Sequence, residues 1–426
     1  MSERTTEGTV NLNVGQAAAV DAMIAFLKGP EQTFVLKGPA GTGKTFCLKE
    51  LVARTKSRLI FTAPTNKATK VLRDSLTTPD YKPECRTIFS LLGLRLEASG
   101  EVRELKAPED PVDLSKYAAI IIDECSMISK ELRKYINLTL DNYDVKVIYL
   151  GDDAQLPPVK EPQSLVWKLP VGAALTEQMR NANGILRLVT NLRLALAHPA
   201  PSVKFVSDND GETGVWKLRP KDFEASLQSC AAKGKFLEKN GAKAIAWRNV
   251  TVNKLNETIR QHMFPESHTT RWLPGERIIL TEPASDREGK PLATTDDEGT
   301  IQRIVEDTPG GADFRAYNLS VLLDEGRTIC LRVLHESSEK VFAERLEALA
   351  QDARADPRKW KLFWNRKAEF HSIRYSYALT AHRSQGSTYE TVFVDWQDIL
   401  TNRNRHEAFQ CLYVACSRAK RVLVIE

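Results

Sequence analysis

The amino-acid sequence predicts an α/β protein with two sheet-and-helix domains. Short apolar runs separated by helical stretches occur at 34–38, 58–64, 118–124 and 145–152. The same alternation returns at 242–249, 390–396 and 421–426, and a glycine-rich loop directly follows the first run. Alternation of this kind is typical of parallel sheets built from βαβ units. With 426 residues, the chain has room for two or three domains.

The first series of elements begins, after a polar start, with an amphipathic helix at 14–29. The strand at 34–38 leads through the glycine-rich loop into a helix at 46–55. Between 92 and 108, alternating runs flank Ser99 and Gly100, a pattern that predicts a β-hairpin. A surface hairpin with no binding role is the competing interpretation of this segment.

The second series contains a helix at 185–199 and a strand at 242–249 that leads into a helix at 250–264. Between about 265 and 335, alternating runs broken by glycine, proline and acidic turns predict a small β-rich insertion. A helical stretch follows at 339–370. Its aromatic residues have the near-helical spacing of a packing stripe, which is more common than a DNA-binding platform; they are Trp360, Phe363 and Trp364.

These patterns give the expected domain boundaries. The first domain spans 1–175 and carries the hairpin at about 92–108 as an insertion. The second domain is formed by 176–260 and 373–426, and 261–372 is inserted between its two parts.

The glycine-rich loop matches the phosphate-binding pattern G-x-x-x-x-G-K-[ST] at every position. Successive backbone N–H groups of such a loop surround phosphates, Lys44 reaches the β and γ oxygens, and the Thr45 hydroxyl holds Mg²⁺ at a helix N-terminus. The sequence therefore predicts binding of ATP with Mg²⁺. The loop residues are Gly38, Pro39, Ala40, Gly41, Thr42, Gly43, Lys44 and Thr45.

Two carboxylates end the apolar run at 118–124. We expect Asp123 to hold Mg²⁺ and Glu124 to activate the attacking water, a pair that favours a hydrolase over a kinase. Gln155, in the polar turn after the run at 145–152, is placed to sense the γ-phosphate. Hydroxyl groups, His382 and Arg418 gather in 380–388 and 413–419, far from the loop in sequence.

Net charge, cysteine spacing and the length of the apolar runs exclude several classes of protein. The net charge is +5 and the pI is about 8.7, so any groove for a polyanion must be local. The seven cysteines are scattered without a C-x-x-C, which supports neither a disulfide framework nor a zinc motif. The start lacks an apolar signal-peptide core and no apolar run approaches ~20 residues. We expect a protein of the cytoplasm that does not enter a membrane.

The chain carries, in order, the segments GPAGTGKT, TAPTNKA, TIFSLL, IIIDE, GDDAQLPP, LTEQMR, TAHRSQGST and YVACSRA. This series resembles the full motif set of superfamily 1 helicases and covers almost the whole chain. It is most similar to the B group, which moves 5′ to 3′ on single-stranded DNA, and within it to Dda-type and RecD-like helicases. The resemblance implies two RecA-like domains, a strand-separating pin in the hairpin, and a small Src-homology-3-type barrel in the β-rich insertion.

The resemblance also implies roles around ATP. Gln16 reads the adenine, and Lys44, Thr45, Asp123, Glu124 and Gln155 keep the roles given above. Arg180 and Arg418 are the two arginine fingers, and Gly386 lines the nucleotide cleft.

Contacts to single-stranded DNA follow from the same resemblance. Several relatives carry His at the positions of Asn66 and Phe89. Phe89 and Trp247 are candidates for stacking on a base, and packing inside the protein is the competing interpretation for both. The implied contacts are Pro64, Thr65, Asn66, Thr87, Phe89, Ser90, Arg248, Asn249, Thr380 and His382.

The expected function is an ATP-dependent DNA helicase that moves 5′ to 3′ and acts as a monomer on single-stranded, tailed or forked DNA. Its expected setting is a bacterial or phage-infected cell, at the nucleoid, with proteins of replication, recombination or repair as partners. One alternative is an ATP-switched clamp for single-stranded DNA that does not move. A P-loop kinase or small-molecule ATPase is a weaker alternative, because the segments at 380–388 and 413–419 have no use there.

Overall fold

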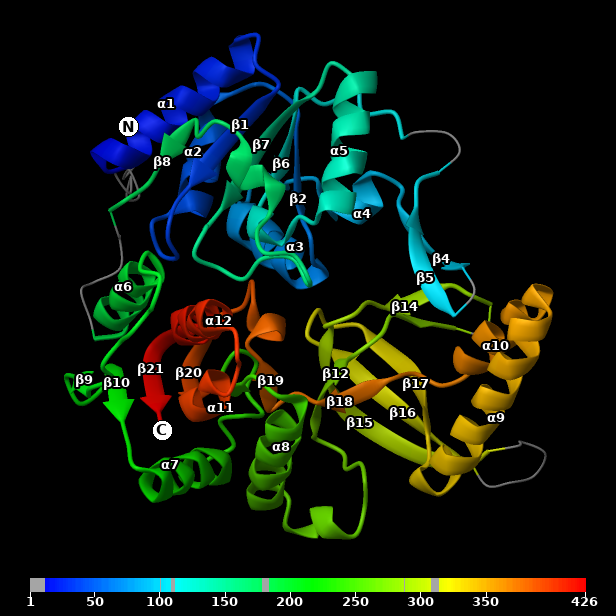
Figure 1. Ribbon diagram of the computed structural model, residues 1–426. Helices are drawn as coiled ribbons and strands as arrows, with labels where there is room; N and C mark the ends of the chain where they lie inside the picture. Colours follow the sequence, from blue (N-terminus) through cyan, green and yellow to red (C-terminus); the bar gives the residue numbers. More distant parts are fainter. Residues whose placement is uncertain (1–11, 100, 109–111, 178–183, 287, 308–313) are drawn as a thin grey trace, which may run out of the picture. The chain divides into compact units, whose positions relative to one another are not determined.

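The computed structural model describes residues 12–99, 101–108, 112–177, 184–286, 288–307 and 314–426 (Figure 1). The chain divides into two compact units. The first contains residues 1–93 and 109–181, and the second contains 94–108 and 182–426. Within the described residues, no helix combines the length and apolar character needed to cross a membrane.

The first unit is built on a six-stranded parallel sheet with the order β3-β2-β6-β7-β1-β8. The four apolar runs predicted as strands form its centre. Its strands are β1 (Thr33–Lys37), β2 (Leu59–Ala63), β3 (Cys85–Thr87), β6 (Ala119–Ile122), β7 (Lys146–Gly151) and β8 (Ala173–Ala174). Its helices are α1 (Val14–Lys28), α2 (Lys44–Arg54), α3 (Asn66–Leu76), α4 (Ile88–Leu91) and α5 (Lys130–Asn142).

Both faces of this sheet are covered by helices (Figure 1). Alternate strand residues such as Leu36, Phe61 and Ile121 share one buried core with side chains of α1, α2 and α3. On the other face, Arg133 of α5 donates to the hydroxyl of the buried Tyr149 in β7. A parallel sheet covered on both faces is what continuous apolar strands such as AIII predict.

The second unit repeats this plan with the strand order β19-β11-β20-β21-β10-β9. All of its strand pairs are parallel except β9 with β10. Its strands are β9 (Asp208–Asn209), β10 (Gly214–Lys217), β11 (Ala242–Ala246), β19 (Ala378–Thr380), β20 (Tyr389–Val394) and β21 (Ala419–Ile425). Its helices are α6 (Gly184–Leu196), α7 (Pro220–Ala232), α8 (Asn249–Met263), α11 (Trp396–Leu400) and α12 (Arg405–Ser417).

The inserted segment forms a five-stranded antiparallel sheet with the order β17-β16-β15-β12-β18 and its own apolar core. Its strands are β12 (Arg277–Leu280), β15 (Glu298–Asp307), β16 (Ala316–Leu323), β17 (Thr328–Leu334) and β18 (Ile373–Tyr375). Two further strands, β13 (Ala284–Ser285) and β14 (Pro291–Ala293), pair with each other. Four of these strands lie on the predicted runs, whereas β18 comes after the helices.

The helical stretch at 339–370 is not continuous. It forms α9 (Glu336–Ala355) and α10 (Trp360–Lys367), separated by Asp356 and a short 3₁₀ turn at Pro357–Lys359. Proline has no backbone N–H to continue the hydrogen-bond ladder, which explains the break.

The hairpin at 92–108 is present as β4 (Arg95–Ser99) paired with β5 (Val102–Lys106). Its contacts group it with the second unit, although it is inserted in the chain of the first. Strand β4 packs against α10, and Glu101 forms an ion pair with Arg354 of α9. Its use as a pin stays a prediction.

Candidate functional site

The phosphate-binding loop joins β1 to α2. Gly41 and Gly43 have φ values of 84° and 82°, in the left-handed region that glycine adopts without strain. A Cβ atom added at Gly43 would lie 2.4 Å from Nε2 of Gln16, so the loop also needs glycine there for space. The Nζ atom of Lys44 donates to the carbonyl oxygens of Gly38 (2.7 Å) and Pro39 (3.0 Å). The lysine ammonium therefore lies at the loop it was predicted to serve.

Gln16 connects the first helix to this loop. Its backbone N–H donates to Asn13, its side chain accepts from the backbone of Asn13, and together they form a capping box at the start of α1. Its Nε2 donates to the carbonyl oxygen of Thr42 (3.0 Å), and the side chain is buried. The structure thus places Gln16 beside the phosphate loop; its reading of adenine stays a prediction.

The two predicted carboxylates follow β6. Asp123 accepts a hydrogen bond from the backbone N–H of Glu124 (2.8 Å). Burial raises the pKa of Asp123, and the positive charge of Lys44 opposes that shift. The carboxylate and the ammonium are therefore close enough to interact. Glu124 has a φ of 52°, which is rare for a residue with a side chain and is a feature found at functional sites.

Strand β7 brings a third segment to the loop. The carboxylate of Asp152 is fully buried and accepts from the backbone N–H groups of Ala40 (3.2 Å) and Ala154 (3.1 Å). Asp153 pairs with Lys37 at 2.6 Å. Gln155 lies buried in the same turn. The sequence predicted Gln155 and missed Asp152, whose partner Ala40 lies more than a hundred residues away.

The oxygen groups near Lys44 fit a magnesium site. Thr45 stands in the first turn of α2 and Asp123 at the end of β6, and hydroxyl and carboxylate oxygens are ligands that Mg²⁺ prefers. The strands β6, β7 and β1 are neighbours and parallel, so these groups share one edge of the sheet.

The DNA-contact candidates of the first unit lie at the same edge, after β2 and β3. Ala63 and Thr87 are paired residues of these neighbouring strands, so the segments 64–66 and 87–90 start side by side. The hydroxyl of Thr65 caps α3 and that of Thr87 caps α4. Asn66 and Ser90 are exposed, whereas Pro64 and Phe89 are half-buried. The structure brings these predicted residues together. Their contact with DNA stays a prediction.

The second unit repeats this arrangement. Ala246 and Thr380 are paired residues of β11 and β19, so Arg248 and Asn249 start beside Thr380 and His382. Trp247 and His382 are half-buried. Burial lowers the pKa of His382, and the negative charge of Glu407 opposes this shift.

Asp398 organises this edge and was not predicted. Its buried carboxylate accepts from the backbone N–H groups of Trp247 (2.8 Å) and Arg248 (2.9 Å) and from the hydroxyl of Thr251 (2.6 Å). It also pairs with the guanidinium of Arg248 at 2.5 Å. Burial raises the pKa of Asp398, but these hydrogen bonds outweigh it and hold the pKa below its usual value.

The predicted arginine fingers have different outcomes. Arg180 falls outside the described residues. The side chain of Arg418 is buried, and it donates to Val414 O (3.0 Å), Ser387 O (3.2 Å) and Ser417 Oγ (2.8 Å). Gly386 has a φ of 71° in the loop that leads to Ser387. The finger role stays a prediction for both arginines.

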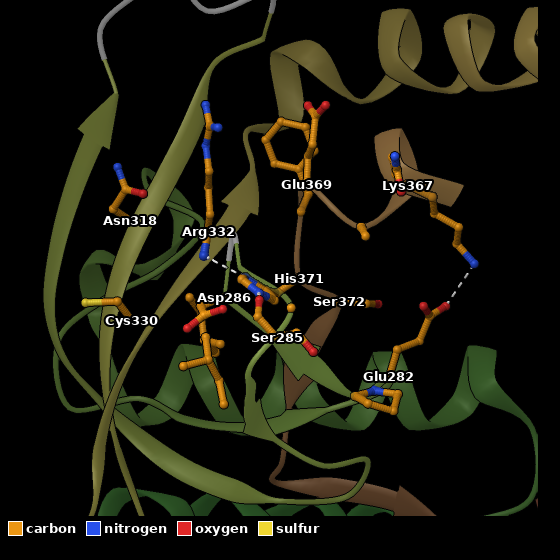
Figure 2. Close-up of a pocket in the computed structure, with 17 residues that line it drawn as sticks. Glu282, Ser285, Asp286, Asn318, Cys330, Arg332, Lys367, Glu369, His371 and Ser372 are labelled. Carbon is orange, nitrogen blue, oxygen red and sulfur yellow. Dashed lines mark hydrogen bonds and ion pairs between the residues drawn. The ribbon is translucent and has the colours of Figure 1, made fainter. Parts of the chain in front are cut away.

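A pocket of about 990 Å³ lies in the inserted segment, away from the phosphate loop in sequence (Figure 2). Its polar groups largely bind one another. His371 accepts from the backbone of Arg332 (2.9 Å) and contacts Ser285 O (2.9 Å), and Lys367 pairs with Glu282 at 3.2 Å. These contacts join the end of α10 to the antiparallel sheet.

Two family models match the chain. Residues 11–210 match an AAA domain, and residues 375–425 match the UvrD-like helicase C-terminal domain. The first match covers the first unit and continues into the second as far as residue 210, and the second match covers the last part of the second unit.

Relatives match nearly the whole chain. The ATP-dependent DNA helicase dda of Enterobacteria phage T4 is 26% identical, with 96% of this chain and 98% of that protein covered. An uncharacterised protein of Acanthamoeba polyphaga mimivirus has the same identity and coverage. Among solved structures, a Bacteroides Pif1 helicase in complex with ADP-AlF3 and ssDNA has a TM-score of 0.51 at 17% identity, with 95% and 91% of the two chains covered. Together, these matches support a superfamily 1 helicase of the Dda and Pif1 type, a class of ATP-hydrolysing DNA helicases.

Proposed function

We propose that this helicase couples Mg-ATP hydrolysis to movement from 5′ to 3′ along single-stranded DNA and to unwinding of tailed or forked duplexes, as a monomer. The observation that supports it most is the shared edge of the first sheet. The nucleotide residues follow β1, β6 and β7, and the DNA candidates follow β2 and β3. A rearrangement at Asp123, at the end of β6, is therefore one strand away from the DNA candidates after β2.

Within the proposal, Lys44, Thr45 and Asp123 hold the triphosphate and its magnesium, which neutralises charge on the phosphates. Glu124 accepts a proton from the attacking water, and Gln155 senses the γ-phosphate. Lys44 must exchange the carbonyl oxygens of Gly38 and Pro39 for phosphate oxygens. Arg180 and Arg418 are proposed as the groups that complete the site, with a contribution of about 10³–10⁵ to the rate.

The proposed DNA contacts are sequence-independent. The N-terminus of α3 at Thr65, the hydroxyl of Thr87 and the guanidinium of Arg248 are groups that bind phosphates. Binding should therefore weaken steeply with salt. Replication, recombination and repair remain the proposed settings, in the cytoplasm at the nucleoid.

One experiment tests the direction. Two duplexes of equal sequence, one with a 5′ tail and one with a 3′ tail, are mixed with the protein, ATP and Mg²⁺ under single-turnover conditions. We expect strand release only from the 5′-tailed duplex. Release only from the 3′-tailed duplex would overturn the direction, and ATP-dependent binding without release from either would favour the clamp that does not move.

A further inference from the structure

Three potential metal ligands converge in the second unit, although the sequence carries no metal-binding motif. They are the imidazole of His382, the carboxylate of Glu407 and the thiol of Cys411, and their ligand atoms lie within 4.8 Å of one another. Glu407 and Cys411 are four residues apart on α12 and share one face of that helix. His382 comes from the short 3₁₀ turn His382–Ser384 after β19.

The contacts that these three groups make inside the protein leave their ligand atoms available. The Nε2 atom of His382 is 3.8 Å from a Glu407 oxygen, which is too long for a hydrogen bond. Among the described residues, neither side chain has a hydrogen bond within normal distance. Cys411 is fully buried, and its thiol is the innermost group of the three. Ligand atoms that converge without hydrogen-bond partners among the described protein groups are arranged as a bound cation would require.

We propose that His382, Glu407 and Cys411 form a three-ligand site for Zn²⁺, distinct from the magnesium ligands of the phosphate loop. One sulfur, one nitrogen and one oxygen ligand form a donor set that suits zinc and disfavours Mg²⁺ and Ca²⁺. Ligands bound to zinc at about 2.0–2.3 Å in a tetrahedron are roughly 3.3–3.8 Å apart, so side-chain rotations of about an ångström bring these atoms into place.

The site is also accessible to a cation from solution. The side chains of His382 and Glu407 are 37% and 35% exposed, so the cation reaches the site from that side and the buried thiol closes the other. Three protein ligands leave the fourth position to water. Bound zinc links the turn that follows β19 to α12, two elements that already pack together, and it should stabilise the second unit.

The test uses cobalt as a spectroscopic probe of thiolate ligation. The protein is first treated with a chelator, and the exposed Cys330 is replaced in all samples by Cys330→Ser. We expect one equivalent of Co²⁺ to produce a thiolate-to-cobalt charge-transfer band, and Zn²⁺ to remove it. The band should vanish in Cys411→Ser and persist in Cys416→Ser. Cys416 is the matched control, because it is equally buried on the same helix but about 140° around its axis.

Glu407→Gln guards against a loss of fold in Cys411→Ser, because its side chain is partly exposed and keeps its size. We expect this variant to bind Co²⁺ at least ten-fold more weakly and to lose the rise in unfolding midpoint that Zn²⁺ gives the second unit. Absence of the band, its survival in Cys411→Ser, or unchanged affinity in Glu407→Gln would overturn the site. None of these measurements depends on ATP hydrolysis or DNA unwinding.

Discussion

Lys243→Met removes a buried charge that joins β11 to the inserted antiparallel sheet. The side chains of Lys243 and Glu298 are only 5% and 7% exposed, and their charged atoms lie 2.9 Å apart. Lys243 also donates to the carbonyl oxygen of Ser376. Removal of one partner from a buried ion pair generally costs about 3–5 kcal/mol.

The neighbouring Arg277 reduces that cost. Its guanidinium lies 3.4 Å from the same Glu298 oxygen and also pairs with Asp324. The negative charge of Glu298 therefore stays partly neutralised when Lys243 is lost. We therefore expect Lys243→Met to destabilise the second unit by about 2–3 kcal/mol. With a urea dependence of roughly 2–3 kcal/mol per M, the midpoint should fall by about 1 M.

The assay is hydrogen–deuterium exchange across a urea series, read by mass spectrometry on peptides from β11 and β15. Peptides are followed separately because a chain with two units need not unfold in one step. Lys420→Met is the control: Lys420 pairs with Glu390 at 2.7 Å, but both side chains are well exposed, so the change should be within about 0.5 kcal/mol. Equal midpoints for the two variants would refute the reasoning.

Four further predictions concern the proposed activity and the pH dependence. Lys44→Ala should reduce ATP hydrolysis below about a tenth of wild type while single-strand binding without ATP persists, since the lysine acts on the phosphates; steady-state turnover and a binding titration check this. Arg418→Lys should bind ATP but not restore DNA-stimulated hydrolysis, because a point charge lacks the planar fork; normal turnover would exclude the finger role. Replacement of 95–104 by a Gly/Ser linker should abolish unwinding and spare ATP hydrolysis, with both activities measured on one preparation. The control is Glu101→Gln, which breaks only the ion pair with Arg354. Equal losses in both activities would mean that the hairpin supports the fold. The pKa of Asp398 is lowered in the folded protein, so its contribution to stability is full above about pH 4 and is lost as the pH falls through the folded value. In acid, the protection of α8 from hydrogen exchange should therefore fall more steeply in wild type than in Asp398→Asn. Parallel curves for the two proteins would contradict this.

The parts of the fold that could be predicted are those with a local pattern. Apolar runs such as 118–122 and 145–150 form strands because they are long enough to be buried on both faces of a sheet. The phosphate loop and Asp123 could be predicted because all the residues that each of these sites needs for its chemistry stand in one short segment of the sequence. The strands β3 and β10 were missed, since three or four residues carry no clear periodicity.

The partners of the site residues could not be predicted. Asp152 accepts from Ala40, and Asp398 accepts from Arg248 across 150 residues of sequence. Such pairs depend on which strands become neighbours, and a single sequence does not specify the strand order. The same holds for His382 and Cys411, which no spacing rule connects.

The strand order of the second sheet has a consequence for synthesis of the chain. β11 lies between β19 and β20, and β10 lies beside β21, so both early strands wait for partners from residues 378–425. At the usual rates of translation, that wait is on the order of ten seconds. The first sheet needs only residues 33–174 and can close earlier. The edges of β10 and β11 that face these later strands therefore stay open to aggregation, and to chaperones, until residues 378–425 have been made.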